Sequence, residues 1–291
     1  MDGTMDLTGK TELELRAMER EIAKQHLDKF PYLSLAWGLG NLVCWLSVWV
    51  LCLNGILPLW AGFIIATINI AASYLPSHEA QHSIFAMPGK SKRWLNELVG
   101  HLSPIPLVTP FSVLRATHME HHKHANDPEL DPDYDHHYET VKGFFWGSLQ
   151  WRQPQPFGRE HPYARCLKRI GREDLLLQSL AYRLVYLGIL CGMALNGLAI
   201  EAALLWWLPW QIAITYIQFY LSWAPHNPGC GTERYSDTQS FKSRLGNIWS
   251  SGMQYHVIHH LYPRIPLVRT PEAARQMQPI LKAQGGRVDA S

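Results

Sequence analysis

Residues 33–57 read LSLAWGLGNLVCWLSVWVLCLNGIL, a stretch of 25 residues without a charged side chain. A second charge-free stretch, LWAGFIIATINIAASYLPS, covers residues 59–77, and Asn54, Gly55 and Pro58 lie at the junction. A helix needs about 20 apolar residues to cross a bilayer core of about 30 Å. The two stretches therefore predict a pair of membrane-spanning helices joined by a tight turn.

A second pair of charge-free stretches occurs later in the chain, at residues 184–200 and 202–224, with Glu201 between them. A buried hairpin in a soluble protein is the competing interpretation of any one such pair. Two pairs are typical of a membrane protein. We therefore predict an all-α integral membrane protein with four transmembrane helices in two hairpins.

The positions of the basic residues predict the orientation of these helices. Five Lys and Arg precede residue 33, thirteen lie between Lys90 and Arg183, and eight lie from Arg234 onward. The two hairpin turns contain none, and basic residues favour the cytoplasmic side. We expect both termini and the long central segment to be cytoplasmic, so that residues 78–183 and 225–291 form one cytoplasmic helical cap.

The overall composition excludes several other classes of protein. The net charge of +2 shows no basic excess of the kind that binds nucleic acid. The five cysteines are scattered and form no C-x-x-C pair, which argues against a disulfide framework or a thiolate zinc site. We expect residues 1–291 to form a single domain, with residues 10–29 as an amphipathic helix before the first span.

Histidines cluster in three short motifs outside the predicted spans. HEAQH places His78 and His82 four residues apart, which puts both rings on one helix face. Two further motifs share the spacing i, i+3, i+4 and again gather three rings on one face. They are HMEHH, with His118, His121 and His122, and HVIHH, with His256, His259 and His260. A lone His226 follows the fourth predicted span. One such motif alone arises by chance, but three together predict a metal centre.

The number of histidines argues against a single zinc ion, which takes about four ligands. Imidazole also suits iron, copper and nickel, and two metal ions would share eight or nine histidines with four or five each. His26, His101 and His161 lack this context and are expected to be ordinary surface or core residues. His124, His136 and His137 lie close to the second motif, and solvated or hydrogen-bonding residues are their favoured interpretation over metal ligands. Six nearby acids are candidates to accept the second ring N–H of the ligands, with a polar, turn-rich loop as the alternative. They are Glu79, Glu120, Asp127, Glu129, Asp131 and Asp133.

Together these motifs resemble the three histidine boxes of the membrane fatty acid desaturase and hydroxylase superfamily. The boxes of that superfamily are H-x(3,4)-H, H-x(2,3)-H-H and a final H-x(2,3)-H-H, with a further histidine after the fourth span. The resemblance implies a mushroom-like fold, with four helices as the stem and a cytoplasmic cap that holds two iron ions. It assigns the metal ligands to His78, His82, His118, His121, His122, His226, His256, His259 and His260, with no other catalytic residue.

The resemblance also implies an activity, namely O₂-dependent oxidation of an unactivated C–H bond in a long lipid chain. Desaturation of a fatty acyl chain is the first expectation, and hydroxylation or ketolation of a carotenoid or another lipid is the alternative. The chain lacks the H-P-G-G signature of a fused cytochrome b5 domain, so a separate ferredoxin, rubredoxin or cytochrome is expected to supply electrons. A zinc-binding membrane protein without oxidative activity is the alternative from another class.

Aromatic residues near the cytoplasmic ends of the spans raise a further question. Trp223, Trp249 and Tyr255 are candidates for lining a substrate tunnel beside the metals. An interfacial belt, in which Trp and Tyr lie at the level of the lipid headgroups, is the favoured interpretation.

Overall fold

The computed structural model describes residues 5–27, 29–153, 160–227, 229–241 and 252–288, together with Asn247 and Ser250. Within these residues the chain is helical, and the single bridge between Gln239 and Arg287 is not part of a strand. The α-helices are α1 (Glu12–His26), α2 (Tyr32–Leu53), α3 (Leu59–Ala72), α4 (Tyr74–Gln81), α5 (Arg93–Leu102), α6 (Phe111–His124), α7 (Val141–Trp151), α8 (Pro162–Arg169), α9 (Asp174–Leu195), α10 (Ala199–Ala202), α11 (Leu208–Ile217), α12 (Ala224–His226), α14 (His256–Leu261) and α15 (Thr270–Ala283).

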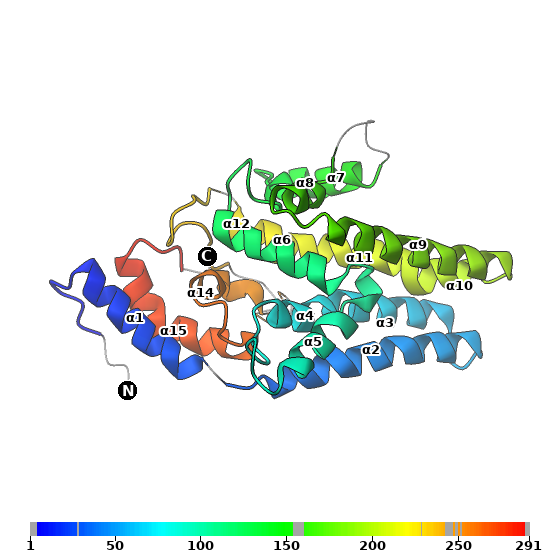
Figure 1. Ribbon diagram of the computed structural model, residues 1–291, viewed down its shortest axis with the longest axis horizontal. Helices are drawn as coiled ribbons and strands as arrows, with labels where there is room; N and C mark the ends of the chain where they lie inside the picture. Colours follow the sequence, from blue (N-terminus) through cyan, green and yellow to red (C-terminus); the bar gives the residue numbers. More distant parts are fainter. Residues whose placement is uncertain are drawn as a thin grey trace.

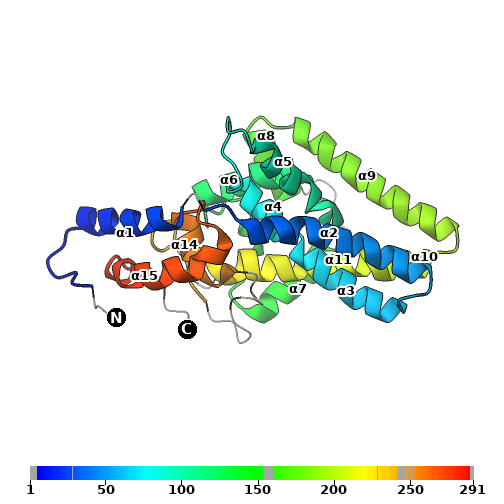
Figure 2. The same ribbon diagram turned by 90° about the horizontal axis from the view of Figure 1, so that it is seen from below.

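Two apolar hairpins run side by side along the long axis of the molecule (Figures 1 and 2). One consists of α2 and α3 and turns at Gly55, where φ is +69°. The other joins α9 to α10 and turns at Gly197, where φ is +81°. Both turns need a left-handed backbone, which glycine adopts without steric cost. The prediction of a helical protein is therefore confirmed for the described residues, and the count of four membrane-spanning helices stays a prediction.

Three described helices are long and apolar enough to cross a membrane: Tyr32–Leu53, Leu59–Gln81 and Asp174–Leu195. The predicted boundaries of the third span, residues 184–200, were wrong. That helix begins ten residues earlier and ends at Leu195, because Asp174 and Arg183 are accommodated within it and residues 196–198 form the turn. The first helix likewise ends at Leu53 and not at residue 57.

The fourth predicted span, residues 202–224, is a succession of helical segments that abut one another from Ala199 to His226. Two of them are π-helical, η3 (Ala203–Trp207) and η4 (Gln218–Trp223). Each π segment comes directly before a segment with proline at its second residue, Pro209 in α11 and Pro225 in α12. Proline lacks an N–H and its ring crowds the preceding turn, which accounts for a widened turn at both places.

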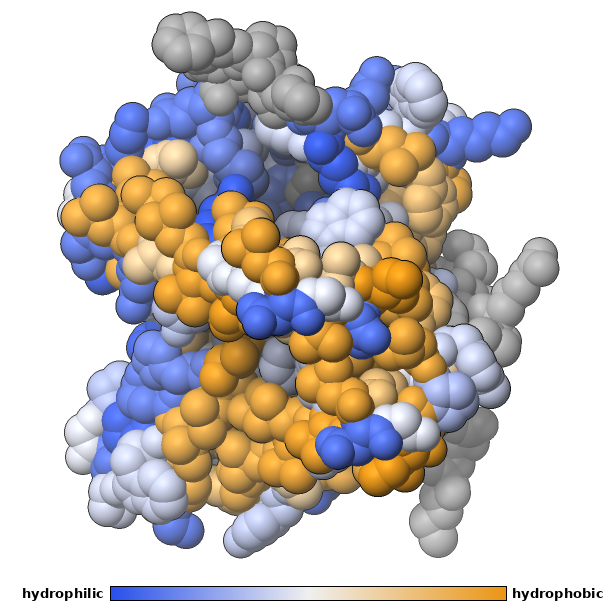
Figure 3. All heavy atoms as spheres, turned by 90° about the vertical axis from the view of Figure 1, so that its right-hand side faces the viewer, coloured by the Kyte–Doolittle hydropathy of each residue, from blue (hydrophilic) through white to orange (hydrophobic). Residues whose placement is uncertain are grey.

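Contacts between α2, α3 and α11 hold the hairpins together. Trp45, Ile70, Trp206 and Ala213 form part of the shared core. The other faces of these helices stay apolar and exposed, as at Val43 of α2 and Ile68 of α3. Seen from the end that carries the two turns, hydrophobic side chains cover much of the surface (Figure 3). Such a surface suits a lipid environment and not water.

The opposite end of the molecule is built from short helices around a second core. There α1 packs along α15, and Ala23, Ile258, Met277 and Leu281 are buried between α1, α14 and α15. The predicted amphipathic helix at residues 10–29 is thus confirmed as α1, and its buried face lies against the protein. This end carries the third histidine motif on α14 (Figure 1).

Gly100 allows α5 to approach α6, which carries the second histidine motif. A Cβ at this position would lie 2.6–2.8 Å from three ring atoms of Phe111, the first residue of α6. We expect Gly100→Ala to destabilise the protein by about 1–3 kcal/mol because the ring has to move. Thermal unfolding in detergent measures the effect. Gly188→Ala is the matched control, since a Cβ there meets no atom within 4 Å and should be tolerated.

Candidate metal centre

All nine histidines that the sequence singled out lie together where α4, α6, α12 and α14 meet. The structure divides eight of them into two groups, and within each group one ring nitrogen per residue lies within 4.8 Å of the others. The first histidine group consists of His78, His82, His118 and His259. The second histidine group consists of His121, His226, His256 and His260.

His122 joins the two groups. Its Nε2 lies 3.1 Å from Nε2 of His118 and 3.0 Å from Nε2 of His259, so it faces the first group. Its ring also lies against the ring of His260, with centroids 4.3 Å apart. The Nε2 atoms of His82 and His118 lie 2.9 Å apart. The four Nε2 atoms therefore form a chain of close contacts in the order His82, His118, His122 and His259.

Ordinary hydrogen bonds do not account for this chain of nitrogens. Each Nε2 of a neutral imidazole carries either one hydrogen or one lone pair, so four atoms form two good hydrogen bonds and not three. A cation between the rings accepts all the lone pairs at once. Imidazole binds such metals at about 2.1 Å, which separates neighbouring ligands by about 3.0 Å in an octahedron and about 3.4 Å in a tetrahedron. The observed 2.9–3.1 Å is short enough for these nitrogens to share one cation.

The second group is oriented by acceptors on its outer side. His121 Nδ1 donates to Asp131 Oδ1 at 2.9 Å, and His260 Nδ1 donates to Asp237 Oδ2 at 3.2 Å. His226 Nδ1 donates to the backbone oxygen of Asp237 at 3.0 Å. These bonds fix the tautomer and leave Nε2 with its lone pair.

The Nε2 atoms of His226, His256 and His260 are buried and have no hydrogen-bond partner in the described structure. The Nδ1 atom of His256 contacts Met253 Sδ at 3.2 Å, so its Nε2 too is free to bind a ligand. Buried polar atoms are rarely left without a partner, and a missing ion is a recognised reason. The donor set therefore fits a metal ion.

Burial also keeps most of these imidazoles in the form that binds metal. It lowers the pKa of six rings well below the ordinary value, and neighbouring histidines add to the effect. These six are His82, His118, His122, His256, His259 and His260. Neutral imidazole is the ligand form, so these rings need not release a proton to bind a cation.

His121 differs because it forms a buried pair with Asp131. Burial alone would lower the pKa of His121, but the charge and hydrogen bond of Asp131 outweigh it and raise that pKa to about 9. A metal ion at Nε2 of His121 therefore has to displace the second ring proton. Burial would likewise raise the pKa of Asp131, yet His121 holds it at about 2. Asp131 thus places a negative charge directly behind one ring of the second group.

Most of the acids that the sequence proposed as partners of the ligands have other roles. Among the six, Asp131 bonds to a histidine of the nine, and Asp133 Oδ2 lies 4.0 Å from His121 Nδ1. Glu120 pairs with Lys123 and Arg169, and Asp127 accepts from backbone N–H groups of its own turn. Glu79 Oε1 accepts from the backbone N–H of Leu267 at 2.7 Å. Glu129 has no carboxylate contact to a histidine in the described structure.

Two residues of the centre were missed by the sequence reasoning. Asp237 lies in a loop eleven residues after His226, where no motif spacing marks it. Asn126 has φ of +65° and its Nδ2 donates to the backbone oxygens of Gly231 and Asp237. Its backbone N–H donates to Asp131 Oδ2 at 2.8 Å, so Asn126 ties the loops that carry both carboxylates.

The histidines expected to be ordinary lie outside both groups. His26 contacts Gln276, His101 and His124 lie 3.8 Å from glutamates of their own helices, and His161 is the N-cap of α8. His137 stacks on Tyr134. The side chain of His136 lies outside the described part of the structure.

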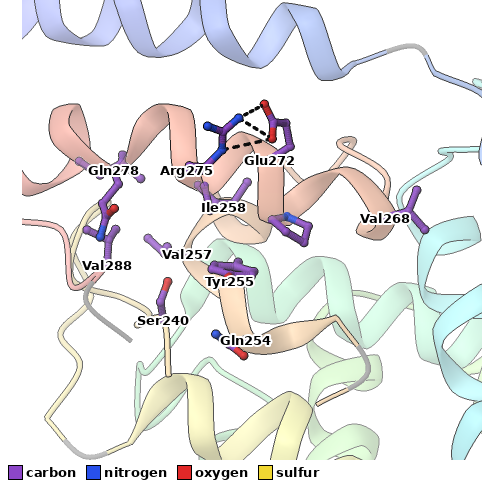
Figure 4. A pocket seen from close by; sticks show the side chains of 13 residues that line it. Ser240, Gln254, Tyr255, Val257, Ile258, Val268, Glu272, Arg275, Gln278 and Val288 are labelled. Carbon is purple, nitrogen blue, oxygen red and sulfur yellow. Dashed lines mark hydrogen bonds and ion pairs between the residues drawn. The ribbon is translucent and has the colours of Figure 1, made fainter. Parts of the chain in front are cut away.

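A cavity of about 770 Å³ lies on the side of α14 that faces α15, between α14 and the loop at Ser240 (Figure 4). Val257, Ile258 and Tyr255 line it, and none of the nine histidines does. Trp223 is buried and donates to the backbone oxygen of Tyr138 at 2.7 Å. Trp249 lies outside the described residues. Trp223 and Tyr255 thus have contacts of their own, and the substrate tunnel stays a prediction.

Comparison with known proteins agrees with this arrangement. The family model described as "Fatty acid desaturase" matches residues 54–291, which is most of the chain and includes all nine histidines. The chain belongs to the fatty acid desaturase family. Family membership and the three apolar helices together indicate an integral membrane protein.

Relatives of this fatty acid desaturase family member include dihydrorhizobitoxine desaturase of Bradyrhizobium elkanii, 26% identical over 70% of this chain and 63% of the relative. The sn-1 oleoyl-lipid 12-desaturase of Synechocystis is 32% identical over 26% of this chain and 25% of the relative. The sn-2 acyl-lipid omega-3 desaturase (ferredoxin) of Helianthus annuus is 24% identical over 72% and 53%. The chain spans less than two thirds of the length of these relatives.

Proposed function

We propose that this protein is a membrane-bound, O₂-dependent oxidoreductase that introduces a double bond into a fatty acyl chain. The observation that carries the proposal is the meeting of nine histidines from four helices, with buried ring nitrogens that face one another. Membership of the desaturase family supports it. The names of the relatives, which are desaturases of lipids or of dihydrorhizobitoxine, favour desaturation over the alternative of hydroxylating or ketolating a carotenoid.

The proposed cofactor is a pair of iron ions. The first group with His122 would hold one ion, and the second group would hold the other. The nine donors argue against the alternative of a zinc protein, since zinc takes about four ligands. Bound there, the two irons would supply the activation of O₂ that amino-acid side chains do not provide.

The overall reaction balances with two electrons from outside the chain. A CH₂–CH₂ unit, O₂, two electrons and two protons give CH=CH and two water molecules. A separate ferredoxin, rubredoxin or cytochrome is the proposed donor of these electrons. The name of the Helianthus annuus relative, which includes ferredoxin, supports this class of partner.

The chain's own residues position and shield the centre. Asp131 and Asp237 hold His121 and His260 in one tautomer. Asn126 donates its backbone N–H to the Asp131 carboxylate and its side-chain amide to the backbone oxygen of Asp237. Burial excludes water around the rings, with His78, His256 and His259 each at most 3% exposed. The centre lies at the end of the apolar hairpins, where the acyl chain of a membrane lipid can approach. From the distribution of basic residues we propose that this end and both termini are cytoplasmic.

Metal analysis and product analysis together test the proposal. Purified protein is expected to contain about two irons per chain, and a host that expresses it is expected to gain a new unsaturated acyl species. One zinc per chain would support the zinc protein instead. An oxygenated carotenoid or lipid in the pigment and lipid profile, without a new double bond, would replace desaturation by hydroxylation or ketolation.

A further inference from the structure

The two histidine groups differ in what lies behind their rings. In the second group, Asp131 and Asp237 accept from Nδ1 of His121 and His260, and the Asp237 backbone oxygen accepts from His226. The Asp131 carboxylate is 1% exposed and that of Asp237 is 14% exposed. Two negative charges thus lie in a mostly buried layer around a single group.

The first group lacks this layer. Within the described residues, none of His78, His82, His118 and His259 donates to a carboxylate or a carbonyl oxygen, and these rings contact other rings. The Nδ1 atom of His78 is buried without a partner. His122 gives this group a fifth nitrogen, but that nitrogen brings no negative charge.

This difference has a thermodynamic consequence for a divalent cation. A carboxylate behind a histidine makes the ring a stronger donor and fixes its orientation before the metal arrives. In a low-dielectric interior the charge also attracts the cation directly. We propose that Asp131 and Asp237 make the two metal positions unequal, so that the second group binds metal more tightly than the first. The inference rests on the proposed function only in taking both groups as metal sites.

Titration of the metal-free, full-length protein in detergent with Co²⁺ tests the inference without any turnover. Absorbance and competition with a chelator are expected to resolve two steps of one equivalent each, with dissociation constants at least about tenfold apart. Asp237→Asn keeps an oxygen that accepts from His260 but removes the charge. It should weaken the tight step about 10–100-fold and leave the weak step unchanged. Asp131→Asn should act in the same way.

Two sets of variants show which group each step belongs to. His82→Ala should leave the tight step intact, whereas His256→Ala should remove it. Asp127→Asn is the matched control, because Asp127 lies on the loop of Asp131 but accepts from its own turn. Two equivalents bound with one affinity, or a tight step that survives in His256→Ala, would overturn the inference and leave the proposed function standing. Wild-type protein that binds no metal would overturn both.

The wild-type titration and the histidine variants show whether the two histidine groups bind metal with different affinities, even if Asp237→Asn fails to fold. Circular dichroism of each variant identifies such a failure. An Asp237→Asn protein that folds and retains both wild-type affinities would contradict the role assigned to the carboxylate.

Discussion

His121→Ala and His260→Ala are each expected to abolish oxidation of the acyl chain while the protein still inserts into the membrane. Each substitution removes a ring whose Nδ1 is held by a carboxylate and whose Nε2 faces the other rings of the second group. The apolar hairpins are untouched, so membrane insertion should not change. The measurements are iron per chain, new unsaturated acyl species in the host and the amount of protein in the membrane fraction.

His124→Ala is the matched control for this prediction. His124 lies on α6, three residues after His121, but it belongs to neither group and lies 3.8 Å from Glu120. We expect it to keep iron and activity. Substantial turnover in both His121→Ala and His260→Ala would count decisively against the metal assignment, whatever the family membership.

Glu19→Ala is expected to destabilise the protein by about 2–4 kcal/mol, because four donors lose their buried acceptor. The carboxylate of Glu19 is fully buried in α1. It accepts from Tyr262 at 2.7 Å and at 3.0 Å from each of Arg234, Tyr235 and Gln284. Tyr262 follows the third histidine motif and Arg234 precedes Asp237, so Glu19 ties the N-terminal helix to the segments around the metal centre.

Thermal unfolding in detergent measures the loss of stability in Glu19→Ala. Two other variants serve as references for its size. Glu21→Ala should have little effect, because Glu21 is exposed and pairs with Lys24 on the same helix. Glu19→Gln should fall between the two, since an amide keeps one acceptor and loses the charge. A Glu19→Ala protein as stable as Glu21→Ala would show that α1 does not contribute to the cap.

The sequence predicts the helical hairpins and the nine histidines well because both depend on local patterns. A run such as residues 33–57 has the length and composition of a span, and H-x-x-H-H spacing fixes which rings share a helix face. The start of α9 was placed ten residues too late because Asp174 and Arg183 break the apolar run without breaking the helix. Charged side chains at the end of a span can remain helical if they reach the interface.

The partners of the histidines depend on tertiary contacts that spacing does not encode. Six acids near the motifs were plausible, but the loop after Asn126 turns so that Asp131 reaches His121 and Asp127 does not. Asp237 reaches His260 across 23 residues of chain, and no local signal marks it. The hydrogen bonds of Glu19 were likewise not predictable from local sequence, since its partners lie more than 200 residues away along the chain.

The π-helical segment η4 has a consequence for His226. Successive residues of an α-helix are offset by about 100° around its axis, so the extra residue of a widened turn changes the rotational phase of everything after it. His226 is the last residue of α12, immediately downstream of η4. Its imidazole therefore faces the other rings partly because of the extra residue in η4, which rotates the helical segment that follows. A one-residue deletion between Gln218 and Trp223 would rotate the His226 ring away from the other rings, although all nine histidines would still be present.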